Sequence, residues 1–170
     1  FMSNPFHSSQ YSIEHAERRI IEFEREASAF HKTNPCERVT ERDLNTMENV
    51  YKIKLTKPMP IALPGIAFDA VNNLRSALDQ AGYATAIAAG TNGKRAKFPF
   101  GLDLTEVKSR ATGTAKDIPK EIFDVMVSCQ PYKGGNDLLW ALNMLCNTNK
   151  HEIILPIAMG TGTHSIVLMA

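Results

Sequence analysis

Apolar residues recur at alternating spacings of three and four positions between residues 12 and 32. The recurring positions are Ile13, Ala16, Ile20, Phe23, Ala27 and Phe30. Steps of three and four residues share one helix face, so this pattern predicts a helix with a narrow apolar stripe. We expect Ser12 to be its N-cap and Asn34-Pro35 to end it. The stripe predicts packing on the protein's own core, with a dimer-forming helix pair as the alternative.

Two segments of different character follow. Residues 36–56 predict a β-hairpin, because β-prone positions on either side surround a polar turn at residues 45–49. Residues 64–89 predict a second long helix whose many alanines allow close packing, and the Gly90-Thr91-Asn92-Gly93 stretch breaks it.

Shorter periodic segments complete the predicted fold. We expect helices at 103–112, 118–129 and 137–151, with Asp103 capping the first, and C-terminal strands at 153–155 and 165–169. The fold class is mainly α with minor β (α+β), an antiparallel helical core with a β-hairpin and C-terminal strands. No repeat or linker interrupts residues 1–170, so we predict a single domain. The chain stops on an apolar run, which favours a native protein that extends beyond residue 170.

Composition narrows the class of protein. A chain of 170 residues with 44% hydrophobic and 22% charged residues is typical of a globular domain with a core. The net charge of +1 gives no whole-chain argument for binding nucleic acid or membrane, although a local basic patch stays open. No run of about 18 apolar residues exists, so no membrane span is expected. Three widely separated cysteines favour a reducing cytoplasm over a disulfide framework.

Neither a metal site nor a cofactor site is predicted. The five histidines show no HxxxH or HExxH spacing. Residues 90–94 (GTNGK) share glycines and a lysine with phosphate-binding loops, but a P-loop needs GxxxxGK[ST] between a strand and a helix. We interpret this stretch as a surface turn.

Two polar faces are the candidate functional residues. Asn72, Arg75, Ser76 and Asp79 share one face of the 64–89 helix, and Asn143, Asn147, Lys150 and His151 share one face of the 137–151 helix. We expect the two faces to meet, because both lie beside apolar positions where an unpaired charge is costly.

This cluster has two interpretations. Asp79 opposite His151 would give a carboxylate-oriented imidazole, as a general base requires. Arg75 or Lys150 would then bind an anion such as phosphate, with Asn72 and Asn147 beside them. The alternative is a polar network that ties two helices together and performs no chemistry.

Several short motifs in order resemble a family of uncharacterised bacterial proteins. The family pattern reads LRSALDH, FP-aliphatic, QPY, LWxL and NxDKHR. The matching positions here are Leu74 to Asp79, Phe98-Pro99, Gln130-Pro131-Tyr132, Leu139-Trp140, and Asn147 with Lys150-His151. The resemblance covers about residues 65–155 and by itself implies no activity.

The LRSALDH helix is in turn similar to that of HEPN domains, helical modules often found in prokaryotic toxins and defence ribonucleases. Those domains carry an Arg followed four to six residues later by a His. The resemblance implies an HEPN-like ribonuclease or nucleotide-handling enzyme, with Arg75 binding phosphate, His151 as base and Asp79 orienting it. This chain departs from the pattern at Gln80, where the His is expected, and at Asn149 and Glu152.

These departures favour a non-catalytic or degenerate HEPN-like binding module, with the enzyme as the alternative. A cytoplasmic location, an RNA or protein partner and no membrane contact are expected. We also predict a homodimer, formed through residues 13–30 or through the alanine-rich 64–89 helix.

Overall fold

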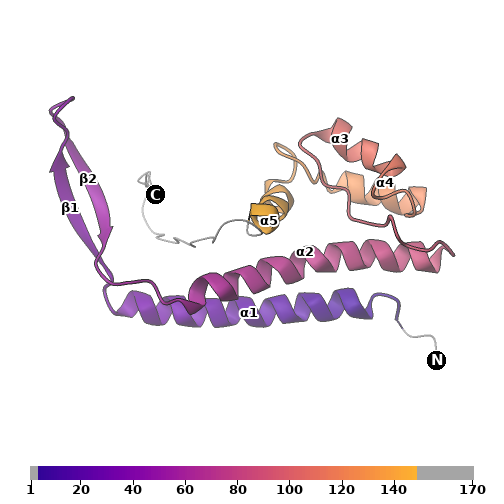
Figure 1. Cartoon of the computed structure of the whole chain (residues 1–170), viewed down its shortest axis with the longest axis horizontal. Coiled ribbons are helices and arrows are strands. Elements are labelled where there is room, and N and C mark those ends of the chain that lie inside the picture. Colours follow the sequence, from indigo (N-terminus) through magenta and orange to yellow (C-terminus); the bar gives the residue numbers. More distant parts are fainter. Residues whose placement is uncertain (1–3, 149–170) are drawn as a thin grey trace.

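The computed structural model describes residues 4–148 and is mainly helical with one small sheet (Figure 1). In chain order the elements are α1 (His7–Lys32), β1 (Cys36–Arg42), β2 (Asn49–Leu55), α2 (Ala62–Ala88), α3 (Leu104–Ser109), the 3-10 helix η1 (Arg110–Thr112), α4 (Lys120–Ser128) and α5 (Asp137–Thr148). The predicted class, mainly α with minor β, is confirmed. The strands expected at 153–155 and 165–169 lie outside the described residues.

Helices α1 and α2 form a long antiparallel pair that runs the length of the molecule (Figure 1). Helix α1 packs against α2 with Ala16 of the stripe fully buried, whereas Ile13 and Ile20 of the same stripe stay about 40% exposed. The prediction of packing within the chain is therefore confirmed for part of the stripe. The predicted N-cap is wrong, because α1 begins at His7 and Ser12 lies inside it. Ser12 is buried, and its hydroxyl donates to Gln80 Oε1 over 3.0 Å. Its polar group therefore joins two helices and does not start one.

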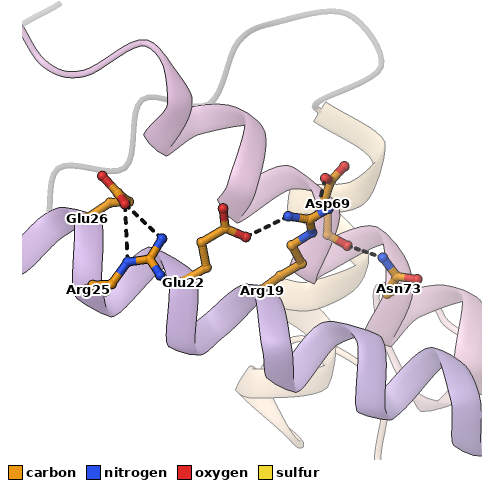
Figure 2. Close-up of polar contacts among 6 residues, drawn as sticks. All are labelled: Arg19, Glu22, Arg25, Glu26, Asp69 and Asn73. Carbon is orange, nitrogen blue, oxygen red and sulfur yellow. Dashed lines mark hydrogen bonds and ion pairs between the residues drawn. The ribbon is translucent and has the colours of Figure 1, made fainter.

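Charged side chains also bridge the pair (Figure 2). Arg19 Nη1 lies 2.6 Å from Glu22 Oε2, and Arg19 Nε lies 3.6 Å from Asp69 Oδ2 across the helix interface. Asn73 Nδ2 donates to the backbone carbonyl of Asp69 over 2.7 Å. These side chains are partly exposed, so each ion pair contributes less than about 1 kcal/mol. The apolar contacts between the helices carry most of the interaction.

The β-hairpin stands away from the helices (Figure 1). Strands β1 and β2 pair antiparallel with Val39 opposite Lys52, and neither strand contains a fully buried residue. Ion pairs between Glu37 and Lys54 and between Glu41 and Lys52 cover one face. A two-stranded sheet that buries neither face is only marginally stable by itself.

A carboxylate organises the hairpin turn. Asp43 Oδ1 accepts the backbone N–H of Asn45 at 2.8 Å and that of Thr46 at 3.4 Å. These hydrogen bonds favour the ionised form and hold the pKa of the Asp43 carboxyl below its ordinary value. The turn is therefore fixed by the side chain that precedes it.

The core lies at the C-terminal end of α2, where α4 and the loop after α2 pack together. Its buried members are Ala86, Ala96, Phe98, Phe100, Ala115, Ile118, Phe123 and Met126. Asp103 caps α3 as predicted, because its Oδ1 accepts the N–H of Glu106 at 2.8 Å. Within residues 4–148, no helix is long and apolar enough to cross a membrane.

Candidate functional site

Arg75 lies at the centre of the contact between α2, α5 and the loop at residues 98–100. Its Nε donates to Asn143 Oδ1 on α5 over 3.3 Å. Its guanidinium carbon lies 4.4 Å from the centroid of the Phe100 ring, a cation–π contact. The side chain is only 16% exposed. Of the two polar faces predicted from the sequence, Arg75 and Asn143 therefore meet.

Asp79 fastens the loop to α2. Its Oδ1 accepts the backbone N–H of Phe98 at 2.9 Å and lies 2.7 Å from Arg75 Nη1. No N–H of Nη1 points at a hydrogen-bond acceptor within the described residues, so the pair with Arg75 is an ion pair without hydrogen-bond alignment. Asp79 therefore holds the chain where Phe98 enters the core.

A second bridge between α2 and α5 joins Asn72 to Cys146. The nearly buried thiol of Cys146 donates to Asn72 Oδ1, with a sulfur-to-oxygen distance of 3.0 Å. Cys146 was missed as a site residue, although it lies three positions after Asn143 and so shares its helix face. Asn147, a predicted ligand-binding residue, is exposed, and its side chain makes no polar contact with residues 4–148.

Gln80 takes part in a different contact. Its Oε1 accepts the hydroxyl protons of Ser8 at 2.9 Å and of Ser12 at 3.0 Å, both on α1. Ser9 adds a buried hydrogen bond of 2.9 Å to the carbonyl of Ala77. Gln80 is thus part of the α1–α2 junction.

Lys150 and His151 lie outside the described residues. The base and the second cation of the predicted site therefore have no assigned position. In the described part of the chain, no group of three or more His, Cys, Asp and Glu side chains is arranged to bind a metal ion.

The described site is a polar junction between two helices and a loop. Asp79 Oδ1 and the Asn72–Cys146 pair find their partners within the protein. Arg75 Nη1 is the exception, since it is buried and its N–H groups have no aligned acceptor among the described residues. Chemically, the cluster offers one nearly buried guanidinium, which is already paired with Asp79.

Comparison with known proteins adds no assignment. No family model matches the chain, and neither a curated protein nor a solved structure matches it. Any functional conclusion therefore rests on the residues and their geometry.

Proposed function

We propose that this protein is a non-catalytic binding module of the bacterial cytoplasm, similar to a degenerate HEPN domain. The observation that supports this most directly is the engagement of Asp79 by Arg75 and by the backbone N–H of Phe98. Both contacts are made by Oδ1, so this oxygen joins α2 to the core loop. Asp79 therefore has a structural role that requires no imidazole partner.

Gln80 supports the same proposal. An amide cannot act as a general base at neutral pH. Its oxygen accepts two serine hydroxyls from α1, so the side chain stabilises the long helix pair. The residue that departs from the HEPN-like pattern therefore has a structural role here.

The second candidate function is an HEPN-like ribonuclease or nucleotide-handling enzyme. It is favoured by Arg75 Nη1, a buried cationic group with no aligned hydrogen-bond acceptor in the described region. In this candidate Arg75 and Lys150 bind phosphate, with Asn72 and Asn147 nearby, and His151 removes the proton.

A ribonuclease assay with four proteins separates the two candidates. Wild type, His151→Ala, Gln80→His and the control His31→Ala, on the exposed end of α1, are incubated with unstructured RNA. We expect no cleavage above background by any of them. Cleavage by wild type that is lost in His151→Ala and kept in His31→Ala would establish the enzyme instead.

The partner belongs to this proposal as well. The module would bind RNA or another protein, and it would do so as a homodimer if one of the long helices pairs between copies.

A further inference from the structure

A cleft lies at the end of the molecule beyond the Arg75 cluster. It has a volume of about 390 Å³ and is lined by Lys94, Arg95, Lys97, Gly113 and Thr114. Three of its five lining residues are cations, in a chain whose net charge is only +1. We call it the basic cleft. None of these residues belongs to the family-like motifs.

The three cations are not neutralised by the protein's own side chains. Lys94, Arg95 and Lys97 are exposed, and none makes an ion pair within residues 4–148. The nearby Asp117 carboxylate accepts the backbone N–H of Arg95 at 2.9 Å from Oδ2, and its single negative charge offsets only one of the three cations. Positive charge therefore accumulates here and is available to an anionic partner.

Burial alternates along this segment. Arg95 and Lys97 are exposed, whereas Ala96 and Phe98 are buried. Lys94 and Arg95 lie in a turn, and Lys97 follows it, so the chain presents all three cations to solvent within four residues.

The backbone of the basic cleft is held in place. Lys97 N donates to Thr114 O at 3.0 Å, and Asp117 N donates to Arg95 O at 2.9 Å. The Thr91 hydroxyl donates to the carbonyl of Asp117 over 3.2 Å. These contacts join the segment before the cleft to the one after it. A site ordered in advance loses less entropy when it binds a ligand.

An aromatic ring borders the cations. Tyr83 on α2 is 54% exposed, and its ring packs against the backbone of Gly93, the residue before Lys94. Gly93 has φ +66°, and a Cβ there would lie 2.6 Å from the ring, so glycine permits the close approach. An exposed ring beside a basic segment can stack on a nucleic-acid base. Acidic peptides and lipid headgroups carry negative charge but no base, so the ring favours nucleic acid as the partner.

We propose that the basic cleft and Tyr83 form a binding site for single-stranded nucleic acid, with cations on the phosphates and the tyrosine ring on a base. The proposal deepens the binding-module function proposed above and names its partner. The site should bind RNA and DNA alike, because the three cations would contact phosphates and the tyrosine ring would contact a base. Neither contact distinguishes the 2′-hydroxyl of RNA.

The test measures fluorescence anisotropy of labelled twelve-nucleotide strands, oligo-dT and 2′-O-methyl oligo-U, with the full chain. Three phosphate contacts predict that affinity falls about 20-fold between 50 and 200 mM salt. The triple variant Lys94→Ala, Arg95→Ala and Lys97→Ala should lose at least tenfold in affinity at low salt and most of the salt dependence. Tyr83→Leu should lose about fivefold or more, and Tyr83→Phe should bind like wild type.

A matched control removes the same charge elsewhere. Lys32, Arg42 and Lys108 are exposed on three other elements, and none makes an ion pair within the described residues. Their triple alanine variant should bind nearly as well as wild type. Equal losses in the two triple variants would show a general effect of net charge and overturn the site.

Two more outcomes would also overturn the proposal. One is no binding by wild type at low salt. The other is binding to phosphatidylserine vesicles, lost in the cleft variant, with no binding to either oligonucleotide. Amide chemical shifts of wild type give a readout that needs no variant, since residues 94–97 and 113–114 should move on titration while the hairpin should not.

The probes separate this inference from the proposed function. Neither oligo-dT nor 2′-O-methyl RNA carries a free 2′-hydroxyl, so both report binding even if the protein cleaves RNA. Cleavage of unmodified RNA would refute the non-catalytic module and leave the cleft standing, whereas loss of cleft binding alone would refute only the cleft.

Discussion

Arg75 uses each part of its guanidinium for a different neighbour. Nε binds Asn143, Nη1 pairs with Asp79, and the flat face covers the Phe100 ring. A lysine at this position could supply charge but not the planar stacking and the directed N–H at once. The residue is therefore a specific joint between α2, α5 and the core loop.

Asp79→Ala should lower the free energy of unfolding by about 1–3 kcal/mol, because it removes the acceptor of the Phe98 N–H and the partner of Arg75. The carboxylate is about one-third exposed, so water compensates part of the loss. Asp79→Asn retains an oxygen that can accept the Phe98 N–H, so it should lower the free energy of unfolding by less. Urea unfolding measures both, and equal stability of Asp79→Ala and wild type would contradict the proposed joint.

Asp43 gives a pH dependence confined to the hairpin turn. Because its pKa is lowered in the folded state, its stabilising contribution is fully present above the unfolded-state pKa of about 3.9 and is lost as pH falls through the lower native value. The rate of hydrogen exchange at the Asn45 amide should therefore rise, compared with the rates at the α2 amides, as the pH is lowered through this range. Asp43→Asn should show no such step.

Some of the candidate site could be predicted from the sequence. Three- and four-residue spacing placed Asn72, Arg75 and Asp79 together, and Asn143 was expected opposite them. The partner of Asp79 could not be found this way, because it is a backbone N–H that every residue except proline carries. Cys146 was overlooked because a thiol is a weak donor and is more often read as apolar.

At the scale of elements, two glycines of α2 make a matched pair. A Cβ on Gly82 would overlap the carbonyl oxygen of Ala96, whereas one on Gly65 meets nothing within 4 Å. Gly82→Ala should therefore destabilise the fold by about 1–3 kcal/mol, since the core loop must move. Gly65→Ala should stabilise by about 0.5–1 kcal/mol through helix propensity. Thermal unfolding of the two variants should show shifts of opposite sign.

The bounds of α2 were predicted to within two residues, whereas α1 begins five residues before its predicted N-cap. The buried face of α2 could not be predicted from its spacing. Ala67, Val71 and Leu74 recur at steps of four and three, as on one helix face, yet those residues are only half-buried. Ser9 of α1 contacts Ala77, and the Ala96 loop approaches Gly82, so α2 is covered on more than one side. Small residues at such contacts carry little hydrophobic signal in a sequence.

At the scale of the molecule, the homodimer stays a prediction. Packing of α1 on α2 leaves Ile13, Ile20 and Ile21 substantially exposed. If α1 mediates a dimer, Ile20→Arg should convert it to a monomer, whereas Ile61→Arg, exposed at the start of α2, should not. Sedimentation at several concentrations measures the mass, and a wild-type monomer at the highest concentration would refute the dimer.

The hairpin has a further consequence for how this protein can change over time. Its two ends are already joined without it, because Thr56 N donates to the carbonyl of Pro35 at 2.7 Å and the Thr56 hydroxyl adds a second bond at 3.0 Å. The chain therefore enters and leaves residues 36–55 at one point beside the helical pair, and the two ends are hydrogen-bonded to each other there. A longer loop or a whole domain could replace the hairpin at this point. The main cost in stability would be the entropy of loop closure, which grows slowly with loop length. Evolution can therefore vary this appendage while α1 and α2 keep their packing.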